Sequence, residues 1–166
     1  IHRMEAGMHR LMAELWPNRA ENLPFDTPEQ ALVLASIVEK ETALAAERPQ
    51  VAGVFVNRLR KDMRLQSDPT VIFAVTGGEA PLGRPLSKDD LAADSPFNTY
   101  RHKGLPPRPI AHPGRESLAA VLNPMATEAL YFVADGSGGH VFAATLAEHY
   151  KNVARWRKLQ QKNAAD

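Results

Sequence analysis

The chain has 166 residues, of which 44% are hydrophobic and 23% are charged, and its formal net charge is +1. These values fit one soluble globular domain with a core of its own. The near-neutral charge argues against a general electrostatic affinity for nucleic acid. The chain has no cysteine, which excludes disulfides and thiolate metal sites and fits a reducing or an oxidising compartment. Its longest apolar run, 31–38, is far too short to span a bilayer.

The first helices are predicted from spacing and capping signals. Residues 2–15 have apolar side chains at helical intervals, and this amphipathic helix should end before Pro17. The stretch 27–46 is marked most clearly, because Thr27 can cap a helix and Gln30 completes a capping box. This stretch is therefore expected to form one continuous helix.

Further helices are expected along the middle of the chain. Residues 49–62 predict a second long helix, joined to the first by so few residues that a helical hairpin is favoured. A short helix should follow a cap at Ser67 or Asp68, and another should start at the capping box 87–90. Residues 115–122 predict one more helix.

The rest of the chain predicts an irregular lobe and a small β unit. Five prolines between 94 and 114 prevent a helix or a central strand, yet buried-type side chains there indicate an ordered loop lobe. Residues 129–135 and 140–145 read as a β-hairpin, and 146–162 read as a closing helix. The expected fold is α+β, mainly helical, with one hairpin and a Pro-rich loop lobe.

Glu41 is the anomaly in this pattern. On a helical wheel it falls in the middle of the apolar face formed by Leu34, Ile37, Val38 and Ala45. Glu39 points the other way with Ser36, onto what should be a solvated face. Burial would raise the pKa of Glu41 and make it a general acid near neutral pH. A side chain whose head group reaches solvent or pairs with arginine is the alternative that the residues alone leave open.

Glu47 and Asp68 are candidates for a second carboxylate, which most glycosidases require. Both have ordinary structural explanations, since Asp68 fits a helix cap and Glu47 lies where the first long helix should end. The loop residues Asn98, Thr99 and Tyr100 offer the polar and aromatic groups that suit sugar recognition. A purely structural loop explains them equally well.

Other kinds of site lack sequence support. The histidines do not have the spacing of metal ligands, and residues 136–139 lack the phosphate-binding glycine patterns. No serine stands in a GxSxG elbow. We therefore expect neither a metal nor a cofactor.

Six strings together closely resemble the endolytic murein transglycosylase family, also described as MltG or YceG-like. They are LASIVEKET (34–42), VFVNRL (54–59), RLQSDPTV (64–71), FNTY (97–100), GLPPRPIAHPG (104–114) and YFVADGSGGHVF (131–142). They occur in matching order and cover most of the chain. One departure is Arg108, where the family loop usually has glycine.

The resemblance implies a lysozyme-like catalytic helix in a bacterial lytic transglycosylase that cuts the β-1,4 bond between N-acetylmuramic acid and N-acetylglucosamine. The catalytic glutamate of the family lies in the segment matched by VEKET, and the Glu41-Thr42 pair is similar to the Glu-Ser pair that ends the catalytic helix of lysozyme-like transglycosylases. Both comparisons favour Glu41 over Glu39, and the helical wheel selects it independently. One acid suffices, because the C6 hydroxyl of the substrate is the nucleophile and a 1,6-anhydro ring forms. The residues expected to line the glycan cleft are Asn57, Gln66, Asp68, Asn98, Thr99 and Tyr100.

The resemblance also implies an N-terminal membrane anchor and a LysM-like region in the full-length protein. Neither is evident, and the chain does not begin with methionine, so residues 1–166 are expected to be the catalytic domain alone, from the periplasmic face of the inner membrane. Peptidoglycan strands are the expected partner, with cell-wall synthases as further candidates and nucleic acid excluded. A hydrolytic muramidase and a non-catalytic peptidoglycan-binding scaffold are the competing interpretations.

Overall fold

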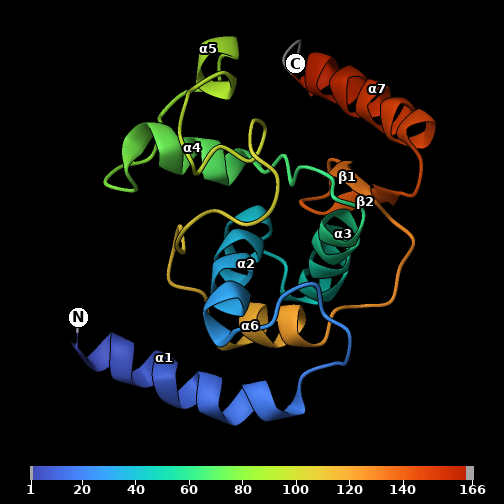
Figure 1. The fold of residues 1–166 in the computed structure, drawn as a ribbon. Coiled ribbons are helices and arrows are strands. Elements are labelled where there is room, and N and C mark those ends of the chain that lie inside the picture. Colours follow the sequence, from blue (N-terminus) through green and yellow to red (C-terminus); the bar gives the residue numbers. More distant parts are fainter. Residues whose placement is uncertain (1, 164–166) are drawn as a thin grey trace.

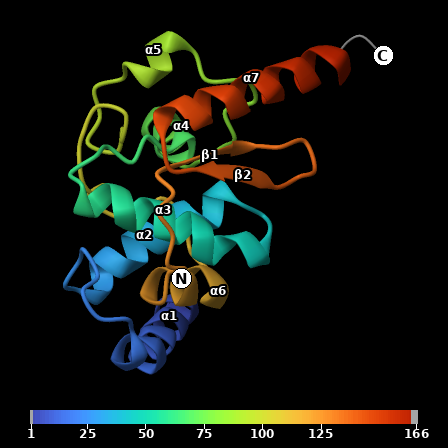
Figure 2. The same ribbon diagram turned by 90° about the vertical axis from the view of Figure 1, so that its right-hand side faces the viewer.

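The computed structural model describes residues 2–163 and confirms a mainly helical α+β fold with one small sheet (Figure 1). Its elements are α1 (His2–Leu15), η1 (Trp16–Asn18), α2 (Pro28–Glu41), η2 (Ala45–Glu47), α3 (Arg48–Arg60), α4 (Asp68–Thr76), α5 (Lys88–Leu91), α6 (Arg115–Leu122), β1 (Tyr131–Ala134), β2 (His140–Ala143) and α7 (Leu146–Asn163). Helices α2 and α3 occupy the middle, α1 and α6 lie at one end, and α7 lies over the hairpin at the other (Figure 2).

Helix α2 begins as the sequence predicts. The Thr27 hydroxyl accepts the backbone N–H of Gln30, and the Gln30 side chain accepts the N–H of Thr27 in return. Every residue from Val33 to Val38 is buried, because α2 is packed against α3, α4 and α6. The helix is therefore enclosed on most sides and forms part of the core.

The end of α2 differs from the prediction, which carried the helix on to Ala46. The backbone of Thr42 is extended (φ −140°, ψ 133°), and its hydroxyl accepts the N–H of Leu44, which stabilises the break. The 3-10 turn η2 then leads directly into α3. Glu41 is consequently the last residue of α2, and Ala45 is not part of its apolar face.

The expected solvated face of α2 is also corrected. Ser36 is fully buried; its hydroxyl donates to the Val33 carbonyl (2.7 Å) and accepts the N–H of Ile110 (3.0 Å). Glu39 accepts the N–H of Gly114 (2.9 Å) and the hydroxyl of Ser117 (2.5 Å). These polar residues attach the Pro-rich segment and α6 to the back of α2, a role that a helical wheel cannot reveal.

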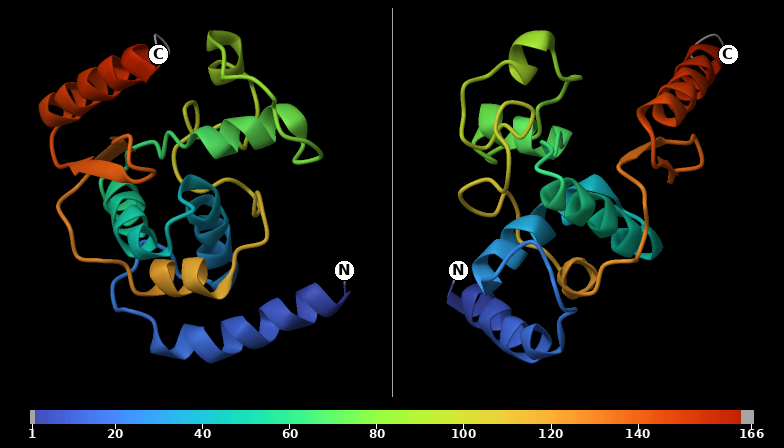
Figure 3. Two further views of the ribbon diagram at one scale, coloured as in Figure 1. Left: turned by 180° about the vertical axis from the view of Figure 1, so that it is seen from behind. Right: turned by 45° about the vertical axis from the view of Figure 1, so that its right-hand side comes forward.

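The hairpin lies between α3 and α7 and contacts both helices (Figure 3). Its strands are antiparallel, with Tyr131 opposite Ala143 and Ala134 opposite His140. The Phe132 ring meets Phe55 of α3 edge-on, with 5.9 Å between centroids. The predicted hairpin and closing helix are thus confirmed, with strands of four residues each.

Candidate functional site

A cleft of about 660 Å³ brings together residues that are far apart in the sequence. Helices α2 and α3, the turn before α4, the Pro-rich loop, the hairpin and α7 all contribute to its lining. Its polar and aromatic lining includes Glu41, Arg58, Gln66, Asp68, Tyr100, Tyr131, His140, His149 and Tyr150. Four of them, Glu41, Gln66, Asp68 and Tyr100, were predicted as site residues from the sequence.

Glu41 enters the cleft from the C-terminal end of α2, with its carboxyl group packed among protein atoms. The Ser67 hydroxyl donates to Oε1 at 2.5 Å. Burial raises the pKa of Glu41 and the negative charge of Asp68 adds to the rise, whereas Ser67 and the Arg58 guanidinium lower it; the net pKa is about 7. A substantial fraction of Glu41 is therefore protonated at neutral pH. Ser67 is bound to Oε1, and no hydrogen bond to Oε2 is formed within the described residues.

The turn before α4 aims Ser67 at Glu41. Gln66 has a left-handed backbone (φ 52°), which is uncommon for a residue other than glycine. Its N–H donates to the Thr99 carbonyl (3.2 Å), and the N–H of Ser67 donates to the Thr99 hydroxyl (3.0 Å). Ser67 precedes the first residue of α4 as predicted, but its side chain makes no capping bond there. The hydroxyl is thereby free to serve Glu41.

Arg58 of α3 connects the segment before β1 to the turn before α4. It is 7% exposed, and its Nε donates to the Leu130 carbonyl at 2.6 Å. Its Nη1 donates to the carbonyls of Arg64 and Leu65 and to Oε1 of Gln66. These bonds give partners to Nε and Nη1 of the buried guanidinium, which remains charged because arginine titrates far above neutral pH. Arg58 thus fixes the left-handed turn at Gln66 and supplies positive charge near Glu41.

Asp68 and Tyr100 form a second polar pair in the cleft. The Tyr100 hydroxyl donates to Oδ1 of Asp68 at 2.6 Å. Asp68 is exposed, while burial and the neighbouring Asp68 charge raise the pKa of Tyr100 above its ordinary value. The phenol therefore stays protonated and orients the carboxylate. Asp68 and Glu41, whose pKa is raised to about 7, therefore line the same cleft.

Three residues expected in the cleft lining lie outside it. Asn57 donates to the carbonyls of Thr127 (2.7 Å) and Ala129 (3.1 Å). Asn98 is fully buried and donates to two backbone carbonyls of the 91–93 segment. Thr99 is 2% exposed and supports the turn at Gln66 and Ser67. Their polar groups are used by the backbone, so these residues shape the cleft walls from behind.

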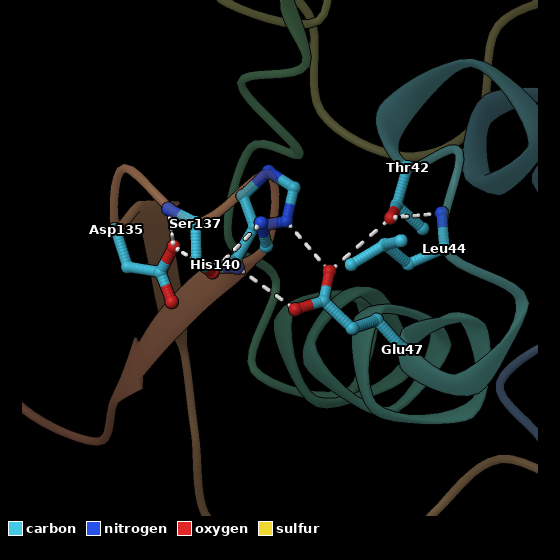
Figure 4. A network of polar contacts seen from close by, with 7 residues as sticks. Thr42, Leu44, Glu47, Asp135, Ser137 and His140 are labelled. Carbon is cyan, nitrogen blue, oxygen red and sulfur yellow. Dashed lines mark hydrogen bonds and ion pairs between the residues drawn. The ribbon is translucent and has the colours of Figure 1, made fainter.

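Glu47 and His140 link the start of α3 to the hairpin (Figure 4). One oxygen of Glu47 accepts the backbone N–H of His140, and the other lies 2.8 Å from its Nδ1. The Thr42 hydroxyl donates to that second oxygen at 3.2 Å. These bonds outweigh burial and lower the pKa of Glu47. Glu47 therefore connects Thr42, the residue after Glu41, to the cleft-lining His140.

The sequence did not predict Ser67 and Arg58 as neighbours of Glu41. It also did not predict that aromatic side chains of the hairpin and α7 (Tyr131, His149 and Tyr150) line the cleft. Arg58 had a detectable signal, because it lies close to the apolar face of α3 and the core rarely accepts an unpaired charge. Ser67 had none beyond its capping role. Within residues 2–163, no group of three or more His, Asp or Glu side chains is arranged to hold a metal ion.

Fold and cleft together define a mainly helical α+β domain in which a buried carboxyl near neutral pKa faces a groove lined by polar and aromatic side chains. The sequence model of the YceG-like family matches residues 1–155. This chain belongs to the YceG-like family.

Two relatives support the assignment. An endolytic murein transglycosylase of Bacillus subtilis (strain 168) is 46% identical over 132 residues, which is 80% of this chain and 35% of that protein. An endolytic murein transglycosylase of Streptococcus pneumoniae serotype 2 (strain D39) is 37% identical over 161 residues, 93% of this chain and 28% of the relative. The chain thus spans about a third of the length of these relatives.

A solved structure is also similar. The crystal structure of a YceG-like protein from Listeria monocytogenes is 43% identical, with a TM-score of 0.67 over 75% of this chain and 38% of the other. Among residues 2–163, no helix combines the length and the hydropathy that crossing a membrane would need.

Proposed function

We propose that this domain is a lytic transglycosylase that cuts the β-1,4 bond between N-acetylmuramic acid and N-acetylglucosamine in peptidoglycan. The observation that carries the proposal is Glu41, a protonatable carboxyl in a cleft. The relatives named as endolytic murein transglycosylases support the choice of substrate.

In the first step Glu41 is the general acid. Its carboxyl proton passes to the glycosidic oxygen, the bond from that oxygen to C1 of N-acetylmuramic acid breaks, and Glu41 becomes a carboxylate. Positive charge develops at C1 and the ring oxygen. Asp68 is exposed in the cleft and oriented by Tyr100, so its negative charge is available to stabilise the developing cation.

In the second step Glu41 is the general base. The C6 hydroxyl of the same sugar attacks C1, its proton returns to the Glu41 carboxylate, and a 1,6-anhydro ring closes. No water is consumed and the enzyme regains its starting protonation state. A pKa of about 7 suits both roles, since neither protonation state is costly at neutral pH.

The other residues that line the cleft bind the glycan strand in this mechanism. Gln66, Asp68 and Tyr100 contact the sugars next to the cut bond, whereas Asn57, Asn98 and Thr99 hold the walls in place. Cutting within strands fits a role in cell-wall assembly, in which nascent strands are terminated or released. The site of action would then be the periplasmic face of the inner membrane, through an anchor elsewhere in the protein, with cell-wall synthases as candidate partners.

The proposal is tested by digesting purified peptidoglycan with wild type and with Glu41→Gln and identifying the ends by mass spectrometry. We expect 1,6-anhydro ends from wild type and none above background from the variant. Reducing ends would assign hydrolysis by water, as in a muramidase. No cleavage by wild type, with glycan binding intact, would assign a scaffold instead.

Glu39→Gln is the matched control, because it makes the same chemical change two positions away in α2. Its carboxylate is bound to Gly114 and Ser117, outside the cleft lining. Undiminished anhydro product from Glu41→Gln would refute the assignment of the acid.

A further inference from the structure

The hairpin and α7 bring aromatic rings into the cleft that the proposed proton transfers do not use. Tyr131 of β1 and His149 of α7 are stacked, with 5.0 Å between centroids and 22° between planes. The Tyr150 ring lies 6.4 Å from that of His149. All three side chains line the same cleft as Glu41. They form a short aromatic wall.

Tyr150 stands out because it is 62% exposed although it lies in a cleft. Leu146, one helical turn earlier, also lines the cleft and is 46% exposed. Large apolar side chains side by side at a concave surface are a common mark of a ligand site. This face of α7 thus offers an uncovered ring and its aliphatic neighbour to whatever occupies the cleft.

The His149 ring beside Tyr150 packs on a neighbouring ring of the hairpin. Burial and the nearby Arg58 guanidinium lower the pKa of His149, so its imidazole is neutral at neutral pH and stacks flat against Tyr131. The Arg58 guanidinium lies over the Tyr131 ring, 5.0 Å from its centroid. Arg58 is itself bound to the Leu130 carbonyl, so the Tyr131 ring packs on an anchored side chain.

The chemistry of this wall fits a pyranose. A sugar ring presents a flat face of C–H groups that packs on an aromatic ring, while its hydroxyls need polar partners around it. Ser67, Asp68 and Arg58 are the side chains that act on the Glu41 carboxyl, and none of them belongs to α7. Tyr150 is not among them, so the exposed end of the aromatic wall is available to a sugar other than the one being cut.

We propose that Tyr150, supported by His149 and Tyr131, forms a sugar-stacking subsite that binds an N-acetylhexosamine ring of the glycan strand away from the scissile bond. The subsite deepens the proposed function and rests on glycan being the ligand. The subsite would bind the glycan strand on the side of the cleft that the hairpin and α7 form.

The test measures binding of peptide-free glycan strands by calorimetry in a Glu41→Gln background, with Tyr150 changed to Phe, Leu or Ala. Phe keeps the ring and should bind within about twofold, while Leu and Ala should bind about tenfold more weakly. In NMR spectra, sugar protons over the ring should shift upfield with Tyr or Phe and not with Leu. Leu159→Ala is the control, because Leu159 is 41% exposed on α7 but lies outside the cleft lining.

Equal affinities for the Phe and Leu variants, or no ring-current shift, would overturn the subsite. So would early thermal unfolding of the Leu and Ala variants, which would assign the ring to the packing of α7. The peptidoglycan digest and the binding series have separate outcomes. If wild type does not cut peptidoglycan but the Tyr150 variants still differ in glycan affinity, the proposed reaction is refuted and the subsite is supported. If 1,6-anhydro ends form but the Tyr150 variants bind glycan equally well, the reaction is supported and the subsite is refuted.

Discussion

Glu39 and Glu41 lie two positions apart on α2, yet their surroundings give them opposite properties. Burial tends to raise the pKa of both carboxyls. For Glu39 the Ser117 hydroxyl, the Gly114 N–H and the Arg48 charge outweigh burial and lower the pKa. For Glu41 the Ser67 hydroxyl and Arg58 do not suffice, and the pKa rises to about 7.

The number and charge of its hydrogen-bonding and ionic partners decide whether a buried carboxyl can release a proton. Glu39 is tied to α6 by donors that favour its charged form, so it holds structure and has no proton to give. Glu41 has one donor and a negative neighbour in Asp68, so its proton remains available. Two positions along one helix separate a structural carboxylate from a candidate acid.

The largest expected effect is on cleavage rate. Glu41→Gln removes the proton donor and should lower kcat by about 10²- to 10⁴-fold, the usual contribution of general acid–base catalysis. Glu39→Gln should leave kcat within a few-fold. Anhydro product formation over time, with matched protein concentrations and circular dichroism spectra, measures both. Similar losses in the two variants would remove the functional distinction between them.

The pH dependence of stability should separate the same pair. The folded pKa of Glu41, about 7, exceeds its value of 4.5 in the unfolded chain, so its stabilising contribution is full below pH 4.5 and lost as pH rises through 7. At pH 8 Glu41→Gln should therefore be more stable than wild type by about 3 kcal/mol. Below pH 4.5 this advantage should vanish. Urea unfolding of both proteins from pH 4 to 8 gives the comparison, and a difference that does not change with pH would contradict the raised pKa.

Glu39→Gln should show a smaller change of the opposite sign. Its lowered pKa means that the carboxylate stabilises the fold at neutral pH and loses this contribution as the pH falls through the folded pKa. Replacing the charged acceptor by an amide should cost about 1 kcal/mol at pH 7. Urea midpoints at pH 7 and under acidic conditions test this, and Ser117→Ala should reproduce part of the loss. A stabilised Glu39→Gln variant would contradict the hydrogen-bonding account.

The smallest effect is a shift of the alkaline limb of the activity profile. Ser67 lowers the pKa of Glu41 and Asp68 raises it. Ser67→Ala should therefore move the fall of kcat/KM to higher pH, and Asp68→Asn should move it to lower pH, each by less than about one unit. Profiles from pH 5 to 9 locate the limb regardless of the absolute rate. Shifts in the same direction would show that another group controls the limb.

Local sequence signals predicted the helix that carries Glu41 and singled out Glu41 itself. The capping box of Thr27 and Gln30 placed the start of α2, and the apolar stripe with Leu34 and Ile37 singled out Glu41. Both depend on residues within a few positions of one another, where helix geometry fixes which side chains share a face. The resemblance to a family added the expected reaction, which no local pattern contains.

The partners of Glu41 could not be predicted in the same way. Ser67 points at Glu41 only because Gln66 takes a left-handed backbone that Thr99 and Arg58 support, and Thr99 is 32 positions from Ser67. The loop asparagine Asn98 looked like a sugar ligand but is used by the backbone. A short polar side chain suits either role, and only its three-dimensional surroundings decide between them.

The bond between Glu47 and His140 spans 93 positions of the chain and attaches one wall of the cleft. Contacts of such high sequence separation are costly in chain entropy and tend to form late in folding. Helix α2 can therefore assemble with α3 before the hairpin docks, at a stage when Glu41 has no finished groove beside it. On a polypeptide growing from its N-terminus, Glu41 is therefore in place before β2 and α7, which complete the lining of the cleft, have been made.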